Sequence, residues 1–250
     1  YDLQSDSGTR HFAGHRLGCW INAIPANGLV MIPEASAGCV CLFSIASTVV
    51  MEPRTPRRPW GIYSGVGTAT PVKQLALNLG APGDRRDATG KLWLSYPRPQ
   101  SPKTTGLELN LNLAEKFIKG GRFVSHDGDA SEQSDQPGAW VFTSSAQGIS
   151  RCNVPLRGSG DKPAAYSVTL YFSSNGEKPG QRVFDVRVQG QVVSRNVDVA
   201  KSGAEGTLVL VLRKVKVRDQ LAIELIPKDP QSGPDRQPML SGIEVSEAGG

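Results

Sequence analysis

The four cysteines are the residues with the clearest potential to form a chemical site. Cys39 and Cys41 form a C-x-C pair, which is too tight for the usual C-x₂₋₄-C zinc knuckle, and no suitably spaced histidine pair follows it. In a strand, residues 39 and 41 point to the same face, so we predict a disulfide of Cys19 with Cys39 or Cys41. This disulfide would indicate an oxidising compartment, and buried free thiols are the alternative. We expect Cys152 to be a core thiol.

Other candidate motifs do not complete a catalytic or metal site. None of the three histidines, His11, His15 and His126, lies in a nucleophile or zinc motif. Residues 83–92 have too many residues between their glycines for a phosphate-binding loop, and Leu92 stands where a magnesium ligand is needed. Asp127 and Asp129 lack the glycine and glutamate of a calcium loop. We therefore predict a turn and a solvated loop, with no catalytic residue, metal or cofactor in this chain alone.

Length and charge restrict the class of protein further. The 250 residues allow one large domain, or one domain with a smaller appendage. The sequence begins at Tyr1 without a signal segment, so we expect a processed product or a piece of a longer protein. No apolar run approaches the roughly 20 residues of a transmembrane helix. The net charge is +5, but Lys and Arg are scattered, so we expect no nucleic-acid partner.

Short alternating runs, separated by turn residues at roughly ten-residue spacing, predict an all-β fold. The side chains expected to face inward from the two clearest runs are Tyr166, Val168, Leu170, Phe172, Phe184, Val186 and Val188. We expect Asp185 and Arg187 to form an outward pair on one strand. Gln189 and Gly190 should form a tight turn.

Further elements are expected along the chain. Later strands are predicted at residues 206–212, 220–226 and 242–245, and a short helical turn is predicted at residues 113–118. Trp140 and Phe142 alternate, which favours core packing on one face of a sandwich.

A change in composition divides the chain. Three prolines stand in the basic stretch from Glu52 to Trp60, where they favour extended structure and exclude a central strand. We therefore predict a Pro/Arg-rich linker at residues 54–70. Residues 1–53 should form Gly-separated hairpins, and residues 71–250 should form one β-sandwich with long polar loops.

Three segments of the second domain resemble malectin and its bacterial relatives, a β-sandwich family that binds sugars. Residues 75–83 are similar to the family's opening strand, and residues 87–93 are similar to its D-x-x-G-x-x-W/Y turn. Residues 166–172 resemble an alternating strand of the family, and residues 182–190 resemble the V-F-D-V-x-V-x-G strand and turn that follow it. Residues 238–245 match its closing P-x-L-x-G-I-E-V strand. The resemblance covers about residues 71–247 and implies a malectin-like β-sandwich of the jelly-roll type.

The resemblance also implies a carbohydrate site. Such a site needs aromatic faces for the C–H surface of a pyranose and a few polar groups for its hydroxyls. In the malectin family these groups lie on loops at one end of the sandwich. Carried over by position, the carbohydrate-binding residues are Trp93, Tyr96 and Asp235. The alternative for Trp93 is a buried anchor at the end of a strand, and the tyrosine-rich loops of the eukaryotic lectin are not reproduced.

The first segment has a different resemblance. Residues 18–43 are similar to the last blade of bacterial pyrroloquinoline-quinone-type repeat propellers, in which the sequence A-N-G-L-V, here residues 26–30, connects two strands. A single blade cannot bury both of its faces, so we expect upstream blades in the uncut protein or in another chain. Many such repeats are scaffolds, so the resemblance does not imply a bound quinone.

The leading hypothesis is a non-catalytic carbohydrate-binding or docking module of an exported bacterial propeller protein, located in the periplasm or on the cell surface. Its expected partners are a carbohydrate ligand and the upstream propeller portion. One alternative is the terminal part of a quinoprotein-type oxidoreductase, although the chain has no C-x-x-C-H haem motif. The other alternative is a purely structural assembly domain.

Overall fold

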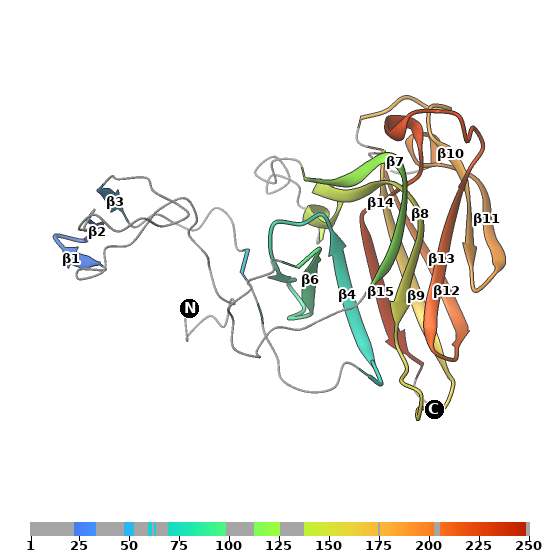
Figure 1. Cartoon of the computed structure of the whole chain (residues 1–250), viewed down its shortest axis with the longest axis horizontal. Helices are drawn as coiled ribbons and strands as arrows, with labels where there is room; N and C mark the ends of the chain where they lie inside the picture. Colours follow the sequence, from blue (N-terminus) through green and yellow to red (C-terminus); the bar gives the residue numbers. More distant parts are fainter. Residues whose placement is uncertain are drawn as a thin grey trace.

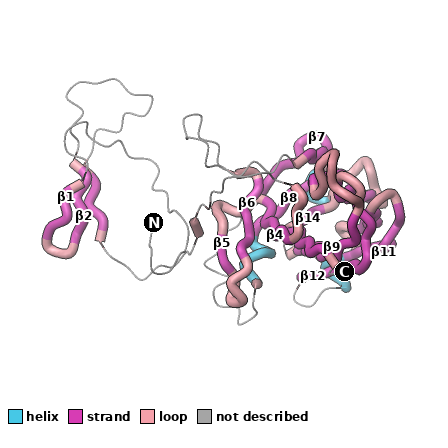
Figure 2. Tube along the Cα trace, turned by 90° about the horizontal axis from the view of Figure 1, so that it is seen from below, coloured by secondary structure: helices cyan, strands magenta, loops and turns pink. Residues whose placement is uncertain are grey.

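Two β-sheets packed face to face make up the main body of the computed structural model (Figure 1). The structure describes residues 23–33, 48–52, 60, 61, 63, 70–98, 113–125, 138–174, 176–202 and 206–248. Strands dominate these residues, and the described helices are single short turns (Figure 2). None of these helices is long and apolar enough to cross a membrane.

One sheet, named here the β9 sheet, has the strand order β12-β9-β15-β4-β6-β5. Its strands are β4 (Gln74–Leu79), β5 (Arg85–Arg86), β6 (Leu92–Tyr96), β9 (Ala164–Ser173), β12 (Thr207–Val217) and β15 (Gly242–Glu247). β4 and β6 run parallel, and the other neighbouring strands in this sheet are antiparallel. The late strand β15 lies between β9 and β4, so it joins the early and middle strands of the domain.

The other sheet, named the β10 sheet, has the order β11-β10-β13-β8-β14, with β7 also paired to β8. Its strands are β7 (Ala114–Ser125), β8 (Ser144–Pro155), β10 (Val183–Val188), β11 (Gln191–Asp198), β13 (Gln220–Pro227) and β14 (Met239–Leu240). The short helical turns are η2 (Ala139–Thr143), α1 (Val199–Ser202) and η3 (Pro234–Arg236).

The core between the sheets confirms the all-β prediction. The inward side chains predicted from alternation are each at most 3% exposed: Tyr166, Val168, Leu170, Phe172, Phe184, Val186 and Val188. Alternate residues of a strand share one face, which is why these runs pack between the sheets. Cys152 is 2% exposed in the same core, as predicted for a core thiol. Gln189 and Gly190 have φ values of 51° and 77°, which confirms the tight turn.

One local prediction was wrong, and another was confirmed only in part. Residues 113–118 do not form a helical turn, because β7 occupies residues 114–125 and pairs with β8. Cross-strand pairing overrides the local helix preference of such a segment. Trp140 and Phe142 lie in the 3₁₀ turn η2. Trp140 is buried as expected, but it packs on a cluster separate from the main core.

The prediction that Asp185 and Arg187 pair with each other was also wrong. Lys228 Nζ donates to Asp185 Oδ2 at 2.8 Å, and Arg187 lies 3.5 Å from a carboxylate oxygen of Glu224. Residues two apart on one strand are separated by about 6.7 Å, whereas directly opposed residues on neighbouring strands are closer. Each charge therefore pairs with a partner on β13 or just after it.

Part of the predicted linker contacts the sandwich. Gly61 forms an antiparallel bridge with Asp84, and the Tyr63 amide donates to Asp84 Oδ2 at 2.7 Å. Asp84 is fully buried and also accepts hydrogen bonds from Arg98 at 2.8 and 3.0 Å. Trp60, next to Gly61, packs against the outside of the domain. These linker residues are therefore held beside β5 and β6.

A small antiparallel sheet near the N-terminus contains β1 (Ile24–Ala26), β2 (Leu29–Ile32) and β3 (Val49–Met51). Asn27 and Gly28 join β1 to β2 with φ values of 53° and 74°, so the predicted connection between two strands is present there. The predictions about the cysteines and histidines of this region concern residues outside the described part: Cys19, Cys39, Cys41, His11 and His15. His126 and the Asp127 loop also lie outside it.

Candidate functional site

The turn between β5 and β6 is built around Asp87. Asp87 Oδ1 accepts hydrogen bonds from the Thr89 amide at 2.9 Å, the Thr89 hydroxyl at 2.6 Å and the Lys91 amide at 3.0 Å. Gly90 has a φ of 84°, a conformation that glycine adopts without strain. Partial burial alone would raise the pKa of Asp87, but hydrogen bonds from Thr89, Trp93 and Lys91 lower it below its ordinary value. The prediction of a turn at this glycine-containing segment is confirmed.

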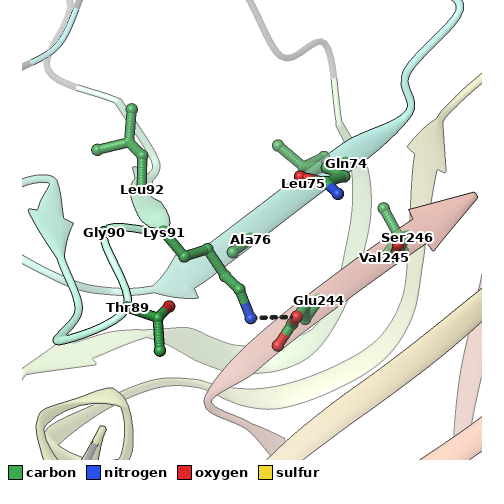
Figure 3. A pocket seen from close by; sticks show the side chains of 10 residues that line it. All are labelled: Gln74, Leu75, Ala76, Thr89, Gly90, Lys91, Leu92, Glu244, Val245 and Ser246. Atoms are coloured by element: carbon green, nitrogen blue, oxygen red, sulfur yellow. Dashed lines mark hydrogen bonds and ion pairs between the residues drawn. The ribbon is translucent and has the colours of Figure 1, made fainter.

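Beside this turn, the outer face of the β9 sheet carries a hollow of about 630 Å³ (Figure 3). Its lining comes from β4, β15, the turn and the first residue of β6: Gln74, Leu75, Ala76, Thr89, Gly90, Lys91, Leu92, Glu244, Val245 and Ser246. The side chains of Lys91 and Glu244 point toward one another across it. The hollow therefore combines a charged pair with hydroxyl and amide side chains on a β-sheet floor.

Glu244 is held from two sides. Lys91 Nζ donates to Glu244 Oε1 at 2.5 Å, and the Tyr171 hydroxyl donates to Oε2 at 2.9 Å. The Lys91 side chain is 42% exposed and that of Glu244 is 21% exposed, so both remain accessible to a solute. Burial and the neighbouring negative charge of Glu244 raise the pKa of Tyr171. Tyr171 therefore stays a hydrogen-bond donor at neutral pH.

An aromatic cluster borders this charged pair, and we name it the aromatic wall. It consists of Trp60, Trp93, Trp140, Phe142 and Tyr171. The Trp93 ring lies 5.7 Å from Trp140 and 5.3 Å from Tyr171, edge to face in both cases. Trp93 Nε1 also donates to Asp87 Oδ2 at 3.2 Å. Trp93 thus connects the Asp87 turn to Tyr171 through the wall.

The three predicted carbohydrate-binding residues are not brought together. Trp93 and Tyr96 are three positions apart on β6 and therefore point to opposite faces of the β9 sheet. Trp93 is only 4% exposed and lies within the aromatic wall. Asp235 lies in η3, which contacts β7 and β8 of the other sheet.

Tyr96 and Asp235 each have their own partners. The Tyr96 hydroxyl donates to Glu115 Oε2 at 2.9 Å, and its ring lies 5.7 Å from that of Phe123. Burial and the Glu115 carboxylate raise the pKa of Tyr96. Asp235 is exposed, and its Oδ1 accepts a hydrogen bond from Gln147 at 3.1 Å.

Sequence reasoning missed Lys91, Glu244 and Tyr171 as a group. Lys91 and Glu244 are 153 positions apart, so no motif contains both. The available signal was partial: the D-x-x-G-x-x-W pattern marks the turn that carries Lys91, and the closing strand contains Glu244. Only the register, which pairs Glu244 with Ala76 on β4, brings them together.

This arrangement suits the recognition of a polar solute. Ammonium donors, carboxylate acceptors and hydroxyls beside aromatic rings are the groups used to bind small polar ligands. Within the described ranges, no group of three or more His, Cys, Asp or Glu side chains is placed to hold a metal ion.

Comparison with family models matches residues 152–229 to the Malectin domain. The matched part begins in β8 and ends just after β13, so it includes strands of both sheets. It contains Tyr171 but neither Lys91 nor Glu244. No curated protein matches the chain.

Similar solved structures include a β-glucuronidase of Bacteroides uniformis, the ANXUR2 extracellular domain from Arabidopsis thaliana and the plant receptor-like kinase FER. Their sequence identities are 16%, 17% and 15%, and their TM-scores are 0.45, 0.48 and 0.46. Each match covers 70% of this chain but only 18%, 41% and 42% of the respective structure. The chain thus spans less than half the length of each. Its residues 152–229 are similar to a malectin domain and form part of a two-sheet β-sandwich.

Proposed function

We propose that the sandwich is a non-catalytic carbohydrate-binding module and that the hollow beside Lys91 and Glu244 holds the sugar. The observation that carries the proposal is the Glu244 carboxylate, fixed between Lys91 and Tyr171 at the edge of the aromatic wall. Fixed acceptors lose little freedom when a ligand binds. The similarity of residues 152–229 to a malectin domain supports the same class of ligand.

The polar groups at the hollow have hydrogen-bonding capacity for sugar hydroxyls. An ammonium group has three donors, and an ionised carboxylate has about four acceptor positions. Within the described structure, Lys91 uses one of its donors in the hydrogen bond to Glu244. Glu244 accepts this hydrogen bond and one from the Tyr171 hydroxyl. Thr89 and Ser246 add hydroxyls at the rim. Binding in such an open site should be weak and reversible.

The residues carried over from the family resemblance have separate proposed roles. Trp93 supports the site by holding the Asp87 turn through its indole N–H. Tyr96 and Asp235 are kept as predicted contacts for a ligand at the end loops. Variants of Glu244 and Asp235 therefore distinguish a site on the sheet face from a site at the loops.

For the biological context, we propose an exported bacterial protein in the periplasm or on the cell surface, with a propeller portion upstream. The turn at Asn27 and Gly28 between two paired strands supports this context, because the propeller resemblance places a connection there. A disulfide of Cys19 with Cys39 or Cys41 is part of the same proposal.

A second candidate is an assembly domain that holds the upstream segment without a ligand. The contacts of Gly61 and Tyr63 with the buried Asp84 favour it. It predicts slow amide hydrogen exchange at Gly61 and Tyr63 in the native chain together with a blank glycan array. Binding of a glycan at the hollow would contradict the claim that the domain has no ligand.

The test of the carbohydrate proposal is a glycan-array screen of the full chain, followed by calorimetry with the best glycan. Glu244→Gln keeps the side-chain shape and removes the charge, and it should weaken binding about tenfold or more. Glu224→Gln is the matched control, because Glu224 is 22% exposed, faces Arg151 and lies on the other sheet. A blank array, or equal losses in the two variants, would contradict the proposal.

A further inference from the structure

Two neighbouring valines on the outer face of the β9 sheet are exposed. Val209 is 45% exposed and Val211 is 51% exposed, both on the edge strand β12. Leu208 and Leu210, which alternate with them, pack against the core instead. One exposed valine is ordinary, but two on the same face of one strand form a small apolar patch.

The strand register connects this patch to the candidate site. Val211 lies opposite Thr169, and Thr169 lies opposite Glu244. Val209 lies opposite Tyr171, whose hydroxyl binds Glu244. Directly opposed residues in antiparallel strands share one face of the sheet, so these side chains form a continuous surface.

This surface is longer than the hollow. From β12 through β9 and β15 to β4, it crosses three strand spacings, or about 14 Å. A parallel row of polar side chains, Ser167, Ser246 and Gln74, lies beside it in the same register. Figure 3 shows Gln74 and Ser246 on neighbouring strands at this end of the hollow. The distance exceeds the width of one pyranose ring.

The surface is apolar at one end and charged at the other. Val209 and Val211 offer no hydrogen bond, whereas Lys91 and Glu244 offer donors and acceptors. A single neutral sugar would contact only one end. A ligand that uses both ends needs several sugar units, with a methyl-bearing substituent toward β12.

We infer that the ligand is an oligosaccharide carrying N-acetyl groups, which lies across the strands from Lys91 to Val211. This inference rests on the proposed function. The acetyl methyl group packs against Val209 and Val211. The polar atoms of the acetamide lie near Thr169, which stands between Val211 and Glu244 in the register. Burial of one methyl group contributes about a fourfold gain in affinity.

Calorimetry on the full chain with two matched sugar series tests the inference. The probes are N-acetylglucosamine oligomers and β-1,4-linked glucose oligomers of one to four units, which share a backbone linkage and differ in the acetamido group. The expected result is tighter binding with each added unit up to about three, and at least a fourfold preference for the acetylated series.

The double variant Val209→Thr and Val211→Thr removes the apolar patch while keeping β-branched side chains suited to a strand. It should abolish the preference for the acetylated series and leave glucose oligomers unaffected. Val193→Thr is the matched control, because Val193 is 36% exposed and lies on β11 of the other sheet. It should change neither series.

The outcomes separate this inference from the proposed function. Equal affinity for all lengths, or a preference that survives the double threonine variant, would overturn the inference and leave the hollow as a site for a smaller sugar. If neither series nor any arrayed glycan binds, the proposed function fails, and the inference fails with it.

Discussion

The Tyr171 hydroxyl donates a hydrogen bond of 2.9 Å to Glu244, a residue 73 positions later on the neighbouring strand β15. The other carboxylate oxygen of Glu244 accepts from Lys91 at 2.5 Å. Tyr171 comes from the middle of the domain, Lys91 from its first turn and Glu244 from its last strand. The fold therefore fixes one acceptor group by contacts from three distant parts of the chain.

Tyr171→Phe tests the first of these contacts. The ring remains in the aromatic wall, so the free energy of unfolding should fall by only about 1 kcal/mol, the usual net value of one hydrogen bond. Loss of the donor frees Glu244 to move, so glycan affinity should fall severalfold. Urea unfolding and calorimetry measure the two effects, and unchanged affinity would contradict the role given to Tyr171.

Lys91→Met tests the second contact. Methionine keeps an unbranched side chain but removes the donors and the charge, so glycan affinity should fall about tenfold or more. Lys228→Met is the matched control, because Lys228 is 43% exposed, close to the 42% of Lys91, and pairs with Asp185 on the opposite sheet. Equal affinities of the two variants would remove Lys91 from the site.

Asp87 gives a dependence of stability on pH. Its pKa is lowered in the folded chain from the ordinary value of 3.8, so the folded state favours the carboxylate. The resulting stabilisation is present above pH 3.8 and is lost as the pH falls through the lower folded-state pKa. Asp87→Asn has no charge to lose there. The stability difference between wild type and Asp87→Asn should therefore shrink between about pH 5 and pH 2.5 in urea unfolding, and a constant difference would contradict the account.

Gly242→Ala tests the packing of the aromatic wall on the sheet. A Cβ at position 242 would lie 2.8 Å from Val141 Cγ1 and 3.3 Å from Trp93 Cζ3. We expect a loss of about 1–3 kcal/mol in the free energy of unfolding and a change in tryptophan fluorescence. Gly233→Ala is the control, because no atom lies within 4 Å of its added Cβ and its φ is −66°. Equal stabilities of the two variants would argue against close packing at Gly242.

How far the sequence predicted this molecule depends on whether a signal is local. The alternation of Tyr166 to Phe172 predicted a buried strand because every second side chain points the same way. The turn at Asp87 was predictable because the hydrogen bonds from the Thr89 and Lys91 amides to Asp87 join residues at most four positions apart. By contrast, β7 replaced a predicted helical turn because pairing with β8 determines its structure.

The site was less accessible to sequence reasoning than the fold. Trp93 was predicted as a carbohydrate contact, with a buried anchor at the end of a strand as the alternative, and its side chain is only 4% exposed. Tyr96, three positions later, faces the other way. Lys91 and Glu244 form a candidate site only as a pair, and neither residue indicates a site by itself. Their proximity follows from the position of β15 beside β4.

Asp84 tests whether the segment at Tyr63 is held by the sandwich. Asp84→Asn removes the charge opposite Arg98, whose side chain is only 11% exposed, so the unfolding free energy should fall by about 3 kcal/mol. Exchange of the Tyr63 amide, which donates to Asp84, should become faster. Asp185→Asn should have a much smaller effect on stability and none on Tyr63, because the partner of Asp185 is Lys228, whose side chain is 43% exposed. Unchanged exchange in Asp84→Asn would show that other contacts hold the segment.

The most direct measurement is an amide chemical-shift titration of the isotope-labelled full chain with the tightest-binding glycan. We expect the largest shifts on Thr89, Gly90 and Lys91 in the turn and on Glu244 and Ser246 in β15. Shifts centred on Tyr96 and Asp235 would place the ligand at the end loops and contradict the site on the sheet face. The absence of any saturable shift would contradict carbohydrate binding itself.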